Sequence, residues 1–270
     1  MKKNLIKAAT LVLGSSLVFA YGAKSIFDFE PYQAKCADDF VVVDCGVCYM
    51  GNDDYEDAPE HEAVVSEFYI CTHEVTQDEY EKIMGTNPSR CKGKNLPVEN
   101  VTWYDAIEYC NRRSIAEGYT PCYTEGFELN IGADGYRLPT ETEWEYAASG
   151  GNKSLGYSFS GSDELDDVAW TPENSGGKIH EVMTKTPNEL GIYDMSGNVS
   201  EWCWDWFGVY PSGKAGLDPE GPSDGDVRIV RGGSYNDKAY YKSGSFRDCK
   251  NPETASANVG FRVVRSGTRG

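Results

Sequence analysis

Three helices are predicted by capping boxes, in which a Thr side chain and an acidic residue three positions later bond the free amides of the first turn. The pairs are Thr76 with Glu79, Thr102 with Asp105, and Thr140 with Glu143. Glycine often ends a helix because it adopts left-handed backbone angles without strain. The helices are therefore expected to stop at Gly85, at Gly118 and at Gly150-Gly151.

Four short apolar runs predict β-strands, at residues 40–43, 63–70, 227–230 and 259–264. Within the second helix, Trp103, Ala106, Ile107 and Cys110 recur at helical spacing and predict one buried face. Few helices, short strands and many connections predict an α+β domain.

The stretch between the last two predicted strands follows neither the helical nor the strand period. It begins at Arg231-Gly232-Gly233-Ser234 and ends at Gly260-Phe261-Arg262, with many Tyr, Asn, Asp and Lys residues between. An active site, a recognition surface and a solvated loop that binds nothing are the three interpretations that this pattern leaves open.

The net charge of the chain argues against two classes of binding partner. The formal net charge is −18 and 43 residues are acidic, which argues against a nucleic-acid or anionic-membrane binder, because phosphate contact needs clustered Lys and Arg. The 270 residues are 40% hydrophobic and include 29 Gly, which favours a single loop-rich domain.

The N-terminus predicts export. Residues 1–23 combine early lysines, an apolar run and the small-residue cleavage signal Val18-Phe19-Ala20, which is typical of a secretory signal peptide. No apolar run is long enough for a membrane span. We expect an N-terminal extension over residues 24–37, a domain over residues 38–266, and a periplasmic, cell-surface or secreted location.

Nine cysteines in an exported chain suggest disulfides, with at least one thiol unpaired. Cys45-Gly46-Val47-Cys48 has redox or zinc spacing, but no second close Cys or His pair completes a metal site, so a structural disulfide or buried thiols is the favoured interpretation. The scattered His61, His73 and His180 are interpreted as surface or hydrogen-bonded residues.

Several motifs together resemble one known family. In chain order they are Phe68-Tyr69-Ile70, Pro97 to Trp103, Arg137 to Ala148, Gly191 to Trp202, Arg231 to Ser234 and Gly260 to Arg262. This order resembles the formylglycine-generating enzyme (sulfatase-modifying factor) family over about residues 38 to 265. The resemblance implies a C-type lectin-like fold of the α+β class, with few helices, short strands and long loops.

The resemblance also bears on catalysis. Enzymes of that family oxidise a sulfatase cysteine with two cysteines that bind copper(I), placed shortly after the Gly-Gly-Ser block. Here those positions read Asp237 and Lys242, and Cys249 is the only cysteine of the segment. A carboxylate and an ammonium are poor ligands for a soft ion. We therefore expect no copper and no catalytic residues.

Residues 232–262 resemble the variable regions of retroelement-diversified proteins, and most closely that of the treponemal variable protein. Those regions run from Gly-Gly-Ser to Gly-Phe-Arg and vary at positions derived from asparagine codons. Many residues here fit such codons, whereas Lys238, Lys250 and Glu253 do not. The resemblance predicts a ligand-binding set of Tyr235, Asn236, Asp237, Lys238, Tyr240, Tyr241, Phe246, Asp248, Cys249, Lys250, Asn251, Glu253, Thr254, Ser256 and Asn258.

The main hypothesis is an exported, non-catalytic protein that binds an unknown protein or surface ligand through this diversified surface. Two alternatives stay open: a formylglycine-generating or related oxidase, and a structural component of an envelope complex. Aromatic side chains offer contact area at low entropic cost, and small polar ones adapt their hydrogen bonds, which favours the main hypothesis.

A calcium site is the second chemical expectation. Asp194-Met195-Ser196-Gly197-Asn198-Val199-Ser200-Glu201 resembles the family's calcium loop, in which the first and last side chains and two carbonyls bind the ion. The resemblance implies Asp194, Gly197, Val199 and Glu201 as ligands, and carboxylate and carbonyl oxygens suit a hard cation. Caps of local turns are the alternative roles of Asp194 and Glu201.

Overall fold

The computed structural model describes residues 39–130 and 132–267. The expected signal peptide and the whole of the expected extension, including Cys36, lie outside these residues. The described residues belong to one compact unit. None of its helices is long and apolar enough to cross a membrane.

The three capping boxes form as predicted. They open α1 (Gln77–Met84), α2 (Trp103–Ala116) and α3 (Glu141–Ala148), and in each box the Thr side chain accepts a bond from the backbone amide three residues on. Gly85 ends α1 in the left-handed conformation, and α2 and α3 end within two residues of their expected glycines. A short α4 (Leu165–Val168) and the 3-10 turns η1 (Gly151–Lys153) and η2 (Ala239–Lys242) complete the helices of the described residues.

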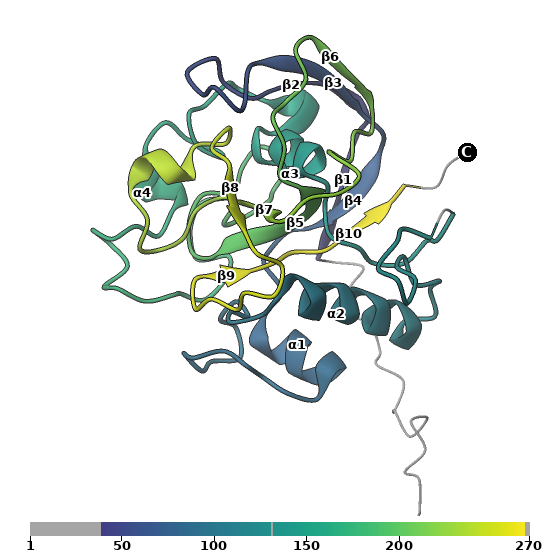
Figure 1. The fold of residues 1–270 in the computed structure, drawn as a ribbon. Coiled ribbons are helices and arrows are strands. Elements are labelled where there is room, and N and C mark those ends of the chain that lie inside the picture. The colour runs from purple at the N-terminus through teal and green to yellow at the C-terminus, as the bar shows by residue number, and fades with distance from the viewer. Residues whose placement is uncertain (1–38, 131, 268–270) are drawn as a thin grey trace, which may run out of the picture. The chain divides into compact units, whose positions relative to one another are not determined.

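Short strands form three small sheets (Figure 1). Their orders are β1-β4-β10, β2-β3-β6 and β8-β7-β5-β9. The strands are β1 (Phe40–Val43), β2 (Gly46–Met50), β3 (His61–Val65), β4 (Phe68–Cys71), β5 (Ser200–Trp206), β6 (Lys214–Leu217), β7 (Arg228–Arg231), β8 (Asp248–Lys250), β9 (Val259–Gly260) and β10 (Val264–Ser266).

Two predicted strands are each broken into two. The run at 63–70 divides into β3 and β4 because Ser66 turns away, with its amide and hydroxyl both bound to Asp218 at 2.7 and 2.6 Å. The run at 259–264 divides into β9 and β10. Between them, the Phe261 and Val263 carbonyls accept bonds from the amides of Val75 and Cys71, which belong to another part of the chain.

The two cysteines of the Cys45-Gly46-Val47-Cys48 motif have different surroundings. Cys45 is exposed, whereas Cys48 lies on the buried face of β2, a strand that the pattern did not reveal. The eight described cysteines are all free, so the expected disulfides are absent from the described part of the chain. Burial raises the pKa of the Cys48 thiol to about 12, which makes it an unreactive core residue.

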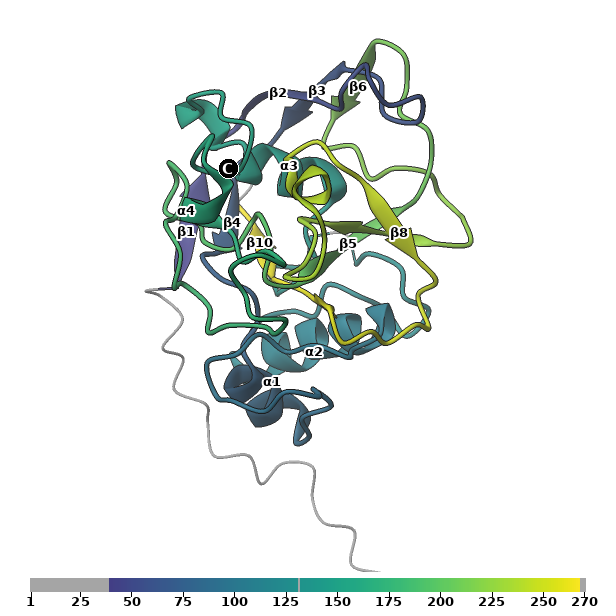
Figure 2. The same ribbon diagram turned by 90° about the vertical axis from the view of Figure 1, so that its left-hand side faces the viewer.

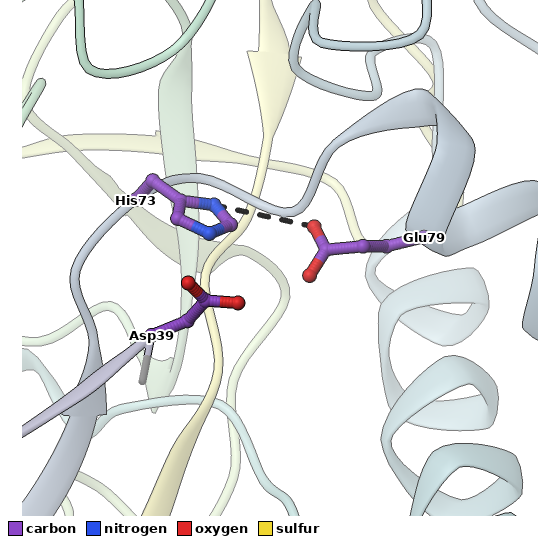
Figure 3. Close-up of side chains that lie close together, drawn as sticks. All are labelled: Asp39, His73 and Glu79. Atoms are coloured by element: carbon purple, nitrogen blue, oxygen red, sulfur yellow. Dashed lines mark ion pairs between the residues drawn. The ribbon is translucent and has the colours of Figure 1, made fainter. Parts of the chain in front are cut away.

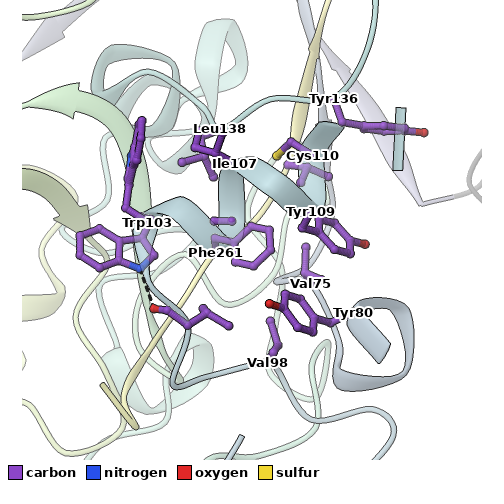
Figure 4. Close-up of a cluster of buried hydrophobic side chains, with 14 of the residues drawn as sticks. Val75, Tyr80, Val98, Trp103, Ile107, Tyr109, Cys110, Tyr136, Leu138 and Phe261 are labelled. Atoms are coloured by element: carbon purple, nitrogen blue, oxygen red, sulfur yellow. Dashed lines mark hydrogen bonds between the residues drawn. The ribbon is translucent and has the colours of Figure 1, made fainter. Parts of the chain in front are cut away.

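The first apolar core surrounds α2 (Figure 4). Trp103, Ile107 and Cys110 are buried there, as their spacing predicts, and Tyr109 joins them. Phe261, which follows β9, packs edge-on against Tyr109 with ring centroids 5.3 Å apart. The C-terminal framework motif is therefore fixed to the second helix.

A second core lies around α3. Trp144 is completely buried, and its Nε1 donates to Glu201 Oε2 at 2.8 Å. Arg262 donates to both oxygens of the same carboxylate, at 2.6 and 2.7 Å. Residues from α3, β5 and the segment after β9 therefore share one buried ion pair, in which every strong donor has a partner.

We expect Trp144→Ala to destabilise the fold by about 3–5 kcal/mol, because it empties a core site and removes one donor to Glu201. Tyr49→Ala is the control, since Tyr49 is an exposed aromatic residue of β2. Urea unfolding midpoints measure both changes. Equal midpoints for the two variants would show that the α3 core does not carry the stability that its burial indicates.

Candidate functional site

The segment between β7 and β10 is anchored to α3 by two buried arginines. Arg231 pairs with Glu145 and also donates to the carbonyls of Gly244 and Phe246. Arg247 makes two 2.8 Å bonds to the carboxylate of Glu141. Figure 2 shows β8, which follows this turn, beside α3. Because a buried charge pair tolerates little movement, these contacts fix the turn at residues 243–247.

A third buried cation, Lys242, supports the segment from inside. Its ammonium donates to the backbone carbonyl of Asp237, and its own carbonyl accepts from Ser196 at 3.0 Å. Burial lowers the pKa of Lys242 to about 8, although Asp237 and Glu173 oppose that shift. The Asp237 carboxylate accepts from the Ser234 amide at 2.9 Å. Asp237 and Lys242, which stand where the resemblance places the copper-binding cysteines of the family's enzymes, thus contact each other as a polar brace.

None of the fifteen predicted ligand-binding residues is buried. The exposed ones are Asn236, Lys238, Tyr240, Tyr241, Asp248, Asn251, Glu253 and Thr254. The half-buried ones are Tyr235, Asp237, Phe246, Cys249, Lys250, Ser256 and Asn258. Buried Lys242, Arg247 and Pro252 lie between them in the chain. The segment therefore alternates inward anchors with outward side chains.

An aromatic cluster forms the apolar part of this surface. Tyr240, Tyr241 and Phe246 pack edge to face, with ring centroids 4.8 to 5.5 Å apart. Tyr55, from the loop between β2 and β3, adds a fourth ring 5.6 Å from Tyr240. Tyr240 and Tyr241 remain 54% and 41% exposed, so the cluster is not a closed core. Edge-to-face packing keeps such rings in place without hiding them.

Two smaller polar groups lie elsewhere on the segment. Ser234 Oγ bonds the side chains of Asn236, Asp237 and Asn258, which brings three predicted residues together. In β8, an edge strand, Asp248 and Lys250 form an ion pair of 3.7 Å. Eight of the predicted residues therefore form one aromatic group and two polar groups.

The predicted calcium loop is buried and strongly curved. Asp194, Gly197 and Asn198 all have positive φ, and a Cβ added at Gly197 would lie 2.7 Å from the Trp170 carbonyl. The Asp194 carboxylate accepts from the Met183 amide at 2.8 Å. Glu201 is held by Arg262 and Trp144.

Glu74 was missed by sequence reasoning and borders this loop. Its carboxylate accepts from the Val199 amide and the Asn198 side chain, at 3.0 and 2.7 Å. Burial is the largest cause that raises the pKa of both Glu74 and Asp194, the latter to about 6. Three buried carboxylates thus face one guanidinium, that of Arg262. This excess of acidic oxygen suits a hard cation near Asp194, while Glu201 already has its counter-charge.

A third cluster, also missed, brings Asp39, His73 and Glu79 together (Figure 3). Among the described residues, this is the group in which three His, Cys, Asp or Glu ligand atoms lie within 4.8 Å of one another. The sequence interpretation of His73 as a hydrogen-bonded residue holds for Nδ1, which is 2.8 Å from the Glu74 carbonyl. Its acidic neighbours come from other elements, so no local spacing could reveal them.

Comparisons with known proteins agree with the fold. The family model for the sulfatase-modifying factor enzyme 1-like domain matches residues 27–267. Treponema denticola variable protein 1 superposes with a TM-score of 0.79 at 34% identity, over 84% of this chain and 95% of that one. The predicted C-type lectin-like fold of the formylglycine-generating enzyme type is therefore confirmed.

Two relatives show how varied the family is. A protein named chaperone protein LppX from Paenibacillus barcinonensis is 40% identical over 265 residues, covering 85% of this chain and 90% of its own. The formylglycine-generating enzyme of Streptomyces coelicolor is 33% identical over 188 residues, covering 63% of this chain and 52% of the enzyme. From the match that spans residues 27–267, we conclude that this chain belongs to the family of sulfatase-modifying factor enzyme 1-like domains.

Proposed function

We propose that the chain is an exported, non-catalytic protein that binds a protein or surface ligand through the segment 232–262. The alternation of buried anchors with exposed side chains carries this proposal. In this proposal, the buried side chains of Arg231, Lys242 and Arg247 hold the segment in its conformation. The exposed side chains between them are then available to contact a partner. The likeness to Treponema denticola variable protein 1 supports the same reading of the segment.

The chemistry of the surface favours a macromolecular ligand. Tyr55, Tyr240, Tyr241 and Phe246 offer rigid aromatic area, and the polar groups around Ser234 and along β8 offer adjustable hydrogen bonds. Paratopes combine the same two kinds of side chain. The exposed edge of β8 adds backbone groups that a partner strand could pair with.

An oxidase is the alternative that the formylglycine-generating relatives favour. Here the brace of Asp237 and Lys242 takes the positions expected for the copper-binding thiolates. Cys249 is half-buried, and burial raises the pKa of its thiol, so the thiolate form that would bind copper is disfavoured.

A chaperone role is a second candidate, favoured by the 40% identity to chaperone protein LppX. Exposed aromatic rings can hold apolar stretches of an unfolded chain. The two binding roles differ in selectivity: a chaperone binds many unfolded chains, whereas a diversified surface binds one folded partner.

Replacing Tyr240, Tyr241, Asp248 and Asn251 together with Ala should abolish capture of the partner while leaving the fold intact, because exposed changes usually cost within about 0.5 kcal/mol each. The measurement is quantitative mass spectrometry of proteins captured from the producing cell's surroundings, together with unfolding midpoints. A control variant with Tyr49→Ala, Val209→Ala and Leu217→Ala changes exposed residues outside the segment.

Wild type and control should capture one common protein that the segment variant loses. Equal capture by all three proteins would contradict the surface assignment. Capture of many denatured test proteins by the wild type would favour the chaperone role instead.

The protein should not convert a sulfatase peptide carrying Cys-x-Pro-x-Arg to formylglycine, because Asp237 and Lys242 cannot form a dithiolate copper site. Mass spectrometry of the peptide after incubation with copper(I) and oxygen measures the reaction, and a family oxidase that has both cysteines is the positive control. Turnover above a metal-free reaction would overturn the non-catalytic assignment.

We also propose that calcium binds at the loop 194–201 and stabilises the fold, with Asp194 as the charged ligand and the carbonyls of Gly197 and Val199 beside it. Glu201, the fourth expected ligand, is already paired with Arg262. A ligand that binds only the native state adds about 2.7 kcal/mol at a hundredfold excess over its Kd. Thermal unfolding with calcium and with chelator should therefore give different midpoints for the wild type. Asp194→Asn should lose that difference, and Asp226→Asn, an exposed control, should keep it. An unchanged wild-type midpoint on chelation would show that the loop holds no calcium.

A further inference from the structure

The cluster of Asp39, His73 and Glu79 joins three elements that lie apart in the sequence. Asp39 precedes β1, His73 follows β4, and Glu79 belongs to the first turn of α1. The amide of Thr72 donates to the Asp39 carbonyl at 2.8 Å, which fixes the backbone of Asp39 beside His73. Figure 3 shows the two carboxylates facing the imidazole ring.

His73 is oriented in the manner of a metal-binding histidine. Its Nδ1 donates to the carbonyl of Glu74 at 2.8 Å, which assigns the proton of the neutral ring to Nδ1 and the lone pair to Nε2. Histidines that bind metals commonly donate their second ring nitrogen to a backbone carbonyl, which fixes the tautomer. His73 is buried, so the ring has little freedom to turn away.

Glu79 is positioned by its capping box. Its Oε2 accepts from the Thr76 amide and hydroxyl, both at 2.8 Å, and lies 4.0 Å from His73 Nδ1. Arg113 lies 4.0 Å from the other oxygen, Oε1. The carboxylate is therefore held beside the ring before any ion arrives, which lowers the entropic cost of binding one.

Two carboxylates and a thiol surround the imidazole ring of His73. Besides the two carboxylates, the buried thiol of Cys71 lies against His73. One ligand atom from each of Asp39, His73 and Glu79 lies within 4.8 Å of the other two, so a single metal ion can reach all three.

We propose that Asp39, His73 and Glu79 bind a divalent transition-metal ion of the zinc type through one imidazole nitrogen and two carboxylate oxygens. One nitrogen and two oxygens suit zinc better than calcium, which prefers an all-oxygen shell. Three protein ligands leave the fourth position to water or to Cys71. The bound ion would link the residue before β1 to the first turn of α1.

The test is isothermal titration of the full chain with zinc chloride. Cys36→Ser, Cys45→Ser and Cys91→Ser are introduced as a common background, so that thiols outside the cluster do not bind the metal. We expect one zinc per chain, a higher melting temperature with zinc, and at least about a tenfold loss of affinity in Asp39→Asn and in His73→Gln. His180→Gln, at a histidine outside the cluster, should bind zinc as the background does.

Asp39→Asn keeps the test decisive if His73→Gln fails to fold, because Asp39 is only half-buried and lies just before β1. Absence of zinc binding in the background protein would overturn the proposal and leave His73 as an imidazolium bridge between acids. Equal affinity in Asp39→Asn and His180→Gln would overturn it as well, because the zinc would then be bound elsewhere.

Discussion

The buried pairing of two glutamates on α3 with two arginines of the C-terminal segment is the interaction on which the rest of the structure depends. Glu145 binds Arg231 and Glu141 binds Arg247, so one helix face holds both ends of the turn at residues 243–247. Loss of one partner would leave a buried charge without compensation, which typically costs about 3–5 kcal/mol. The pairs therefore fix the conformation of a segment that has little regular secondary structure.

The same helix links the segment to the second core. Trp144 follows Glu143 on α3 and donates to Glu201, which also binds Arg262 at the far end of the segment. The segment is thus tied to α3 directly at Arg231 and Arg247 and through Glu201 at Arg262. Apart from the buried Lys242, the exposed side chains between these points have no structural role comparable to that of the anchors, and a variable recognition surface requires that freedom.

The sequence predicts those structural features that depend on residues close together in the chain. The capping boxes at Thr76, Thr102 and Thr140 are local, and all three form. The strands at 63–70 and 259–264 were predicted too long, because Asp218 and Val75, which interrupt them, come from distant parts of the chain. Likewise, the family motifs located the segment, whereas Tyr55, Glu74 and the group around His73 are brought into place only by folding.

The central claim is that anchors and displayed residues of the segment have separate duties, and random substitution tests it most directly. One library would randomise Asn236, Lys238, Tyr240, Tyr241, Asp248 and Asn251, and a second would randomise Arg231, Lys242 and Arg247. Protease resistance on the surface of yeast measures the folded fraction of each library. The account predicts that most members of the first library stay folded and that few of the second do. A similar folded fraction in both libraries would contradict it.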